Sequence, residues 1–187
     1  MDFLRHTVIL LIISVIAIIL GIGCGYQFRA NGEPVGINID SIAIPLITST
    51  SSDKGFEADF TRMIREEFIS HAKIPIVASE EADKVLKGYV YEITTQPLTY
   101  DSTEREVAGR VVTYESTSSR RLQIRLDISL VERATGKTIW RDTSMEEEAR
   151  FNVAADPLVT RYNQQKALIQ ISRLLAKRVY MKTMERF

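Results

Sequence analysis

The chain has 187 residues, with 24 basic and 24 acidic side chains, so its formal net charge is zero. A neutral chain has no overall field that draws it to nucleic acid or to an anionic membrane, so any such binding must come from a local patch. One cysteine and two histidines exclude a disulfide framework and argue against thiolate or histidine metal sites and against Ser-His-Asp or Cys-His catalysis.

The first 23 residues have the pattern of an export signal. Arg5 is the fixed positive charge of a short polar start, and an uncharged apolar run follows from Val8 to Ile22. The run is shorter than a spanning helix needs, and glycines break its end, which is typical of a signal peptide with a small-residue cleavage site. Gly21-Ile22-Gly23-Cys24 has the form of a lipobox, with glycine where leucine is usual.

We therefore expect residues 1–23 to be removed and Cys24 to become the acylated first residue, with palmitate among its chains. The mature chain then keeps 164 residues, enough for one domain with a core, 24–187. Two or more acyl chains hold such a domain on a bilayer, because burial contributes about 0.8 kcal/mol per methylene. The alternative is an uncleaved signal anchor in which Cys24 is buried and inert.

The first half of the mature chain predicts a strand and then a helix. Large apolar side chains recur at alternate positions with one slip at Asp40-Ser41, and the better strand is 41–47; the alternating residues are Ile37, Ile39, Ile42, Ile44 and Leu46. Pro45 cannot donate to a ladder, so this strand lies at a sheet edge or has its Pro45 position facing outward. Residues 55–71 predict an amphipathic helix. Its apolar stripe is Phe56, Phe60, Met63, Ile64 and Phe68. His71, at the end of this helix, suits the negative end of the helix dipole better than it suits catalysis.

Three further strands are predicted. Residues 85–95 are rich in aromatic and β-branched side chains, and residues 122–130 alternate strictly, as a strand with one buried face does. The stretch 97–119 between them is polar and predicts a loop or a long hairpin tip. Gly136 supplies the positive φ of the next turn, and the return strand runs from Thr138 to Phe151 or Val153. Glu146-Glu147-Glu148 is expected to interrupt it as a solvated edge or bulge.

The last element is a long helix, 157–185, with Asp156 as its N-cap and Pro157 at its first position. Its predicted core stripe is Leu168, Ile171, Leu175 and Val179, helped by Ala167 and Leu174. Its other face carries Arg161, Lys166, Arg173, Lys177, Arg178, Lys182 and Arg186. This basic face is the best candidate in the chain for an anionic partner, although such faces are commonly just solvated.

The sequence shows no Gly-rich phosphate loop, no dinucleotide fingerprint and no cluster of metal ligands, so we expect neither a cofactor nor a metal. Its basic residues do not interleave with aromatic ones as they do in single-strand binders, so no nucleic-acid partner is expected.

Several of these features together resemble the LPS-assembly lipoprotein family LptE. The likeness rests on Cys24-Gly25-Tyr26-Gln27-Phe28, on Ile42-Ala43-Ile44-Pro45 and on the hairpin Thr135-Gly136-Lys137-Thr138-Ile139-Trp140. The order of the elements extends it over the whole mature chain. The resemblance implies an α+β fold, a four-stranded mostly antiparallel sheet with two helices packed on one face.

The resemblance also implies a role without catalysis. It implies an outer-membrane lipoprotein, with Gly25 after the cysteine as its sorting signal and its domain facing the periplasm or a barrel lumen. The implied partner is the outer-membrane β-barrel LptD, inside which the domain would lodge as a plug while lipopolysaccharide is delivered to the outer leaflet.

Lipopolysaccharide carries phosphates, which arginine binds strongly and often through two hydrogen bonds. The family has a basic residue before an Asn/Gln-rich start of the last helix, and Arg161 precedes such a segment, Tyr162-Asn163-Gln164-Gln165. The other family contact lies between the second and third strands, where Arg110, Arg120 and Arg121 are candidates by location. Each of these arginines could equally be a solvated surface residue.

Two other functions remain open. The first is an auxiliary or activator lipoprotein of another cell-envelope complex, which exposed apolar strand faces at 85–95 would equally fit. The second is an envelope hydrolase, against which the scarcity of histidine and cysteine argues. A hydrolase should show one deep cleft with perturbed carboxylates.

Overall fold

The computed structural model describes residue 34, residues 36–50 and residues 56–185. The chain divides into two compact units, Met1–Ala30 and Asn31–Phe187, and every helix and strand described below belongs to the second. The predicted signal peptide, the lipobox and Cys24 lie outside the described residues, so export and lipidation stay predictions. Within the described ranges, no helix is long and apolar enough to span a membrane.

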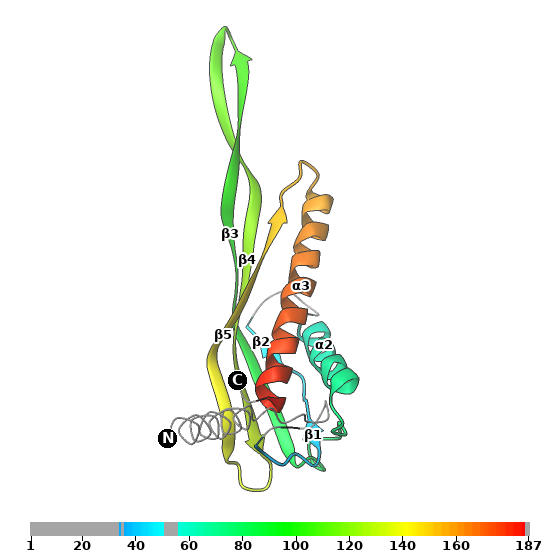
Figure 1. Ribbon diagram of the computed structural model, residues 1–187. Helices are drawn as coiled ribbons and strands as arrows, with labels where there is room; N and C mark the ends of the chain where they lie inside the picture. The colour runs from blue at the N-terminus through cyan, green and yellow to red at the C-terminus, as the bar shows by residue number, and fades with distance from the viewer. Residues whose placement is uncertain (1–33, 35, 51–55, 186–187) are drawn as a thin grey trace, which may run out of the picture. The chain divides into compact units, whose positions relative to one another are not determined.

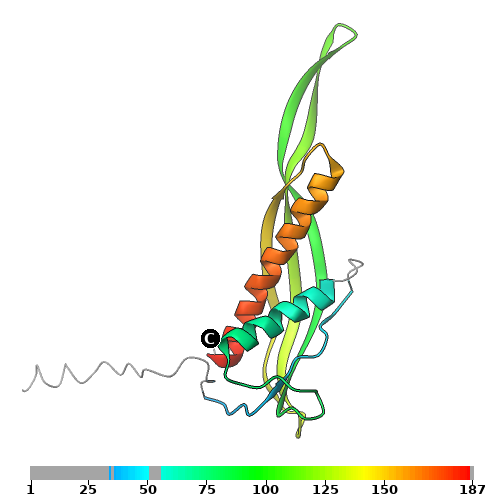
Figure 2. The ribbon, with the colours of Figure 1, turned by 90° about the vertical axis from the view of Figure 1, so that its right-hand side faces the viewer.

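The described elements form one mixed sheet and two helices. The strands are β1 (Ile42–Ala43), β2 (Thr48–Ser49), β3 (Lys84–Val107), β4 (Arg110–Glu132) and β5 (Thr138–Asn152), and the helices are α2 (Phe56–His71) and α3 (Pro157–Met184). β3, β4 and β5 make an antiparallel meander, while β1 and β2 pair parallel with β3. Figures 1 and 2 show both helices on the same face of this sheet. The predicted α+β class is confirmed.

The described sheet has five strands where four were predicted, and the difference lies at the first predicted strand. Instead of one strand there are two short ones, β1 and β2, on either side of Pro45, so the described sheet has five strands. The interruption has a physical cause, because helix α2 takes the backbone groups that a ladder would use. Thr61 Oγ1 accepts from Ile47 N (2.9 Å), and Arg65 Nε donates to the Ile44 carbonyl (2.9 Å). The predicted edge location is confirmed, since β1 ends the strand order.

The stretch 97–119 is strand almost throughout. β3 and β4 continue through it and pair residue by residue up to Val107 and Arg110, so the hairpin alternative is confirmed and the loop alternative is wrong. β-Branched and aromatic side chains recur among its polar ones, as in a strand that is wet on both faces. Gly136 has the positive φ predicted for the other turn, +71°.

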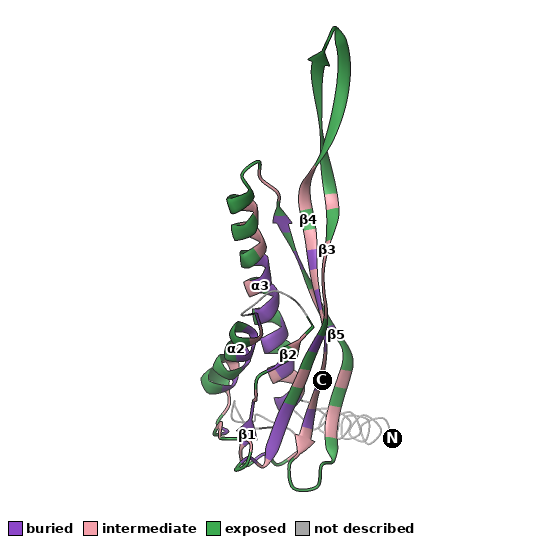
Figure 3. Cartoon of the chain, turned by 180° about the vertical axis from the view of Figure 1, so that it is seen from behind, coloured by how far each residue is buried: buried purple, intermediate pink, exposed green. Residues whose placement is uncertain are grey.

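The core lies between the sheet and the two helices. The alternating side chains of β4 are fully buried: Leu122, Ile124, Leu126, Ile128 and Leu130. The helices cover them with Phe60, Ile64 and Phe68 from α2 and with Ile171, Leu175 and Val179 from α3. Figure 3 shows this burial along the body of the sheet and exposed residues along the far part of β3 and β4.

Helix α3 begins as predicted but buries a narrower stripe. Asp156 caps it, its Oδ1 accepting from Leu158 N at 2.8 Å, and the four predicted core residues are buried. Leu174 does not join them. Its side chain lines a shallow groove of about 510 Å³ between α2 and α3, and the residue is 43% exposed.

The predicted interruption at the three glutamates is wrong, because all three lie within the β5 ladder. The strand alternation places Glu147 toward α3, where Arg178 pairs with it at 3.1 Å. Glu146 and Glu148 point to the open face of the sheet and pair with arginines of β4. Each carboxylate has a cationic partner, so the run fits a regular strand.

Candidate functional site

The β3–β4 ribbon extends well beyond the body of the sheet. β5 pairs with β4 only as far as Ser119, and β2 pairs with β3 only near Val90, so farther out the two strands pair only with each other (Figure 1). We call residues 99–118 the distal hairpin. The side chains of its outer part are exposed. A two-stranded ribbon without a buried face is marginally stable in water, which makes this segment a candidate contact surface.

The distal hairpin has two chemically different faces, because directly opposed residues share a face. The arginine face consists of Asp101, Thr103, Arg105, Val107, Arg110, Val112, Tyr114 and Ser116. The glutamate face consists of Tyr100, Ser102, Glu104, Glu106, Val111, Thr113, Glu115 and Thr117. Asp101 lies at the inner end of the arginine face, so the outer part of that face is cationic and apolar, and the glutamate face is anionic.

The charges of the distal hairpin differ from those of the body in having no partners. Within the described residues, no salt bridge joins its arginines or glutamates to any other group, and its opposed pairs match glutamate with threonine, serine or valine. On the open face of the body, by contrast, Arg125 bridges Glu92 (2.9 Å) and Glu146 (2.8 Å) across three strands. Arg141 likewise holds the pKa of Asp127 below its ordinary value through a hydrogen bond and its charge. Several charged side chains on the open face of the body are thus paired with one another, whereas the arginines and glutamates of the distal hairpin have no ion-pair partner among the described residues.

The four candidate arginines fall into three places. Arg110 lies at the turn of the distal hairpin, ten residues of strand away from Arg120, which corresponds to about 33 Å. Arg120 and Arg121 lie at the base of the hairpin with side chains on opposite faces of the sheet. Arg121 is on the open face and pairs with Glu148 at 3.4 Å. Arg161 lies near the start of α3.

The start of α3 is tied to the base of the distal hairpin. Asn163 Nδ2 donates to the Asn152 carbonyl at the end of β5 (2.9 Å), and Val153 N donates to the Ser118 carbonyl of β4 (2.9 Å). These contacts bring the Arg161 and Arg120 regions to one end of the fold. Neither arginine has an ion-pair partner among the described residues. This contact of Asn163 was not predicted, because no local pattern in the sequence shows which carbonyl its amide reaches eleven residues away.

The basic face of α3 is partly used for packing. Lys182 pairs with Asp142 of β5 at 2.7 Å, and Arg178 pairs with Glu147 of the same strand. Burial raises the pKa of Asp142, but the hydrogen bonds from Lys182 and Ser144 N outweigh it, and the pKa lies below its usual value. Arg186 lies outside the described residues. The described cations of α3 that have no ion pair are Arg161, Lys166, Arg173 and Lys177, and Lys166 Nζ lies 4.8 Å from the centre of the Tyr162 ring.

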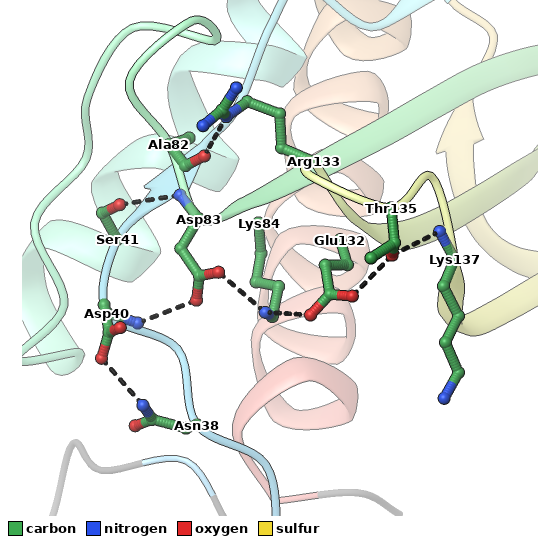
Figure 4. A network of polar contacts seen from close by, with 10 residues as sticks. All are labelled: Asn38, Asp40, Ser41, Ala82, Asp83, Lys84, Glu132, Arg133, Thr135 and Lys137. Carbon is green, nitrogen blue, oxygen red and sulfur yellow. Dashed lines mark hydrogen bonds and ion pairs between the residues drawn. The ribbon is translucent and has the colours of Figure 1, made fainter.

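A second polar cluster closes the opposite end of the sheet (Figure 4). The buried Lys84 Nζ donates to Asp83 (2.8 Å) and to Glu132 (3.0 Å), joining β3 to the end of β4. Burial opposes the charge of Lys84, but these two hydrogen bonds outweigh it and raise its pKa. Asp83 also accepts from Asp40 N, and its own N–H donates to Ser41 Oγ (2.9 Å). The cluster therefore fastens the segment before β1 to the sheet.

The described residues offer little for acid–base or metal chemistry. Every described carboxylate with a shifted pKa, namely Asp83, Asp127, Glu132 and Asp142, has it lowered by a cationic or hydrogen-bonding neighbour. Such shifts are typical of structural ion pairs and keep the groups ionised. Among the described residues, no group of three or more potential ligands could hold a metal ion. What the surface offers instead is unpaired cations at the base and turn of the distal hairpin.

No protein-family model matches the chain, and no curated protein matches it either. Among solved structures, the chain is similar to rare lipoprotein B from Shewanella oneidensis, with a TM-score of 0.43 and 13% identity over 76% of this chain and 92% of that one. It is also similar to lipoprotein B from Nitrosomonas europaea (0.44; 11%; 82% and 88%). A chain described as a neuraminyllactose-binding hemagglutinin homolog from Helicobacter pylori gives 0.49 and 11%, over 84% and 88%. All three TM-scores are below 0.5, so none of these likenesses supports an argument about function.

Proposed function

We propose that this chain is a cell-envelope lipoprotein of the LptE type, anchored to the outer membrane through Cys24. In this role it supports assembly of an LptD-like β-barrel and the delivery of lipopolysaccharide, without catalysis. The observation that carries the proposal is the combination of Cys24-Gly25-Tyr26-Gln27-Phe28 with a domain of the expected class. That domain has a mostly antiparallel sheet, two helices on one face and a long last helix capped by Asp156.

Unpaired arginines at one end of the domain support the lipopolysaccharide part of the proposal. Arg120 and Arg161 have no ion-pair partner among the described residues, and the contacts of Asn163 and Val153 hold their two elements together. A guanidinium without a carboxylate partner is free to bind phosphate through two hydrogen bonds. Arg121 is less suited, because Glu148 already shares its charge. We assign the phosphate contacts to Arg120 and Arg161.

This assignment predicts weaker lipopolysaccharide binding when both arginines lose their charge. The full chain in mild detergent, carrying Arg120→Gln and Arg161→Gln, should bind lipopolysaccharide about thirtyfold more weakly, since two charged hydrogen bonds of about 1 kcal/mol or more each contribute about 2 kcal/mol together. Titration against labelled lipopolysaccharide measures the change. Arg121→Gln is the matched control and should bind within about twofold of the unchanged chain. Equal weakening by Arg121→Gln, or no weakening by the double variant, would contradict the assignment.

The alternative, an auxiliary or activator lipoprotein of another envelope complex, has one feature in its favour. Strand β3 exposes Tyr89 (41%) and Tyr91 (39%), and such rings suit a protein partner of any kind. The two functions differ in the partner that the chain retains when it is taken from its membrane.

A further inference from the structure

The turn at the end of the distal hairpin is apolar where turns in water are usually polar. Ala108 and Gly109 are its two central residues, with φ of +54° and +74°, and Val107 precedes them. Two-residue turns with positive φ at both positions favour Asn-Gly or Asp-Gly, because a residue with a β-carbon is strained there. Ala108 is strained at this position and its side chain is apolar. An asparagine would adopt the same backbone conformation with less strain, and water would hydrate its side chain. A strained residue that persists at an exposed turn is a reason to look for a function.

The arginine face continues this apolar turn. Val107 is 51% exposed and Tyr114 50% exposed, and Val112 lies between them on the same face. Arg105 and Arg110 flank these side chains, and on this outer part of the face no carboxylate accompanies them. An apolar tip bordered by arginine and tyrosine is the composition of segments that sit in a membrane–water interface.

The opposite face limits how this surface can bind. Glu104, Glu106 and Glu115 all point away from the arginine face, and none has an ion-pair partner among the described residues. With the arginine face against an anionic surface, the glutamates point to water, where salt screens them within about 10 Å. The reverse orientation would place three carboxylates against the same surface. The charge distribution thus selects one face and one sign of partner.

We propose that the distal hairpin docks its arginine face on a bilayer that carries anionic phospholipid. The apolar turn enters the headgroup region, and Arg105 and Arg110 bind the lipid phosphates. This contact is separate from the proposed barrel partner and from the phosphate contacts assigned to Arg120 and Arg161. It would give the domain a second point of attachment besides an acylated cysteine.

The test uses the full chain in vesicles with one tryptophan as a depth reporter. In a Trp140→Phe background, Tyr114→Trp places the reporter on the arginine face and Thr113→Trp places it on the glutamate face of the same hairpin. Thr113 and Tyr114 are consecutive exposed residues of β4, so the two reporters lie at nearly the same distance from the turn and differ in the face that they occupy. Vesicles contain brominated phosphatidylcholine as quencher, with or without about 30 mol% phosphatidylglycerol to supply the negative surface charge.

With phosphatidylglycerol present, we expect the Tyr114→Trp emission to shift to shorter wavelength and to be quenched, while the Thr113→Trp emission stays as in water. Arg105→Gln with Arg110→Gln should abolish the shift, and Glu104→Gln with Glu106→Gln should not reduce it. Replacement of both arginines by lysine should retain most of it, because the charge is kept. Circular dichroism of each variant verifies that the sheet is intact.

Either of two results would overturn the proposal. The first is equal behaviour of the two reporters, which would mean that no face is selected. The second is a shift that depends on protein density in the membrane and not on phosphatidylglycerol. That result would mean that the arginine face of one copy contacts the glutamate face of another.

Discussion

Phe68→Ala is expected to lower the free energy of unfolding by about 3–5 kcal/mol, because it leaves a cavity between the two helices. Phe68 is fully buried, and its ring meets that of Tyr180 edge to face, with centroids 5.4 Å apart. Tyr180 in turn donates a hydrogen bond to the carbonyl of His71 at the end of α2 (3.2 Å). The substitution therefore removes core volume and one of the contacts that join α2 to α3.

Urea unfolding of the full chain in mild detergent measures this loss, with the fluorescence of the single tryptophan, Trp140, as its signal. Ile69→Ala is the matched control. Ile69 follows Phe68 in the same helix but is 71% exposed, so its truncation should cost about 0.5 kcal/mol or less. Similar losses in the two variants would contradict the way in which α2 packs on the core.

Lys84→Met is expected to cost about 2 kcal/mol. The methionine fills similar space but leaves Asp83 and Glu132 without the cation that each pairs with. Loss of one partner of a fully buried pair costs about 3–5 kcal/mol, and the figure here is smaller because the two carboxylates are partly exposed. The variant should also loosen the segment before β1, since Asp83 accepts a hydrogen bond from Asp40 N.

The control for this variant is Lys87→Met, three residues farther along β3 and exposed. It should change the free energy of unfolding by about 0.5 kcal/mol or less. A second check adds Asp83→Asn and Glu132→Gln to Lys84→Met, which removes the uncompensated carboxylates and should restore part of the loss. If the triple variant were no more stable than Lys84→Met, the ion pairs would not be the cause.

Much of the fold could be predicted from the sequence where a single local rule applies. Three local patterns each predict one structure, and all three structures are found. They are the strict alternation of 122–130, the Asp156 cap with Pro157, and the turn at Gly136. The apolar stripe of α2 is equally unambiguous.

The differences arise where tertiary contacts decide. The strand around Pro45 is interrupted because Thr61 and Arg65 of a later helix bind its backbone, which no local pattern reveals. The three glutamates are accommodated within a strand because arginines of β4 and α3 lie beside them.

Candidate residues for a site could be named from the sequence, but their arrangement could not. Arginines near 110, 120 and 161 were identifiable from the sequence, yet the pairing of Arg121 with Glu148 depends on the β4–β5 register. The two faces of the distal hairpin likewise depend on which residues oppose each other across its turn. Neither fact can be read from a polar stretch by itself.

The most direct test of the proposed function is to identify what the chain retains when it is taken from its membrane. The full chain, tagged at its C-terminus, is purified in mild detergent, and the proteins that accompany it are identified and quantified by mass spectrometry. The control has the same signal and cysteine followed by an unrelated lipoprotein domain. We expect a large β-barrel in roughly equal amount with the full chain and none with the control. Purification without a barrel, or with a peptidoglycan enzyme in its place, would contradict the LptE-type function and favour the auxiliary-subunit alternative.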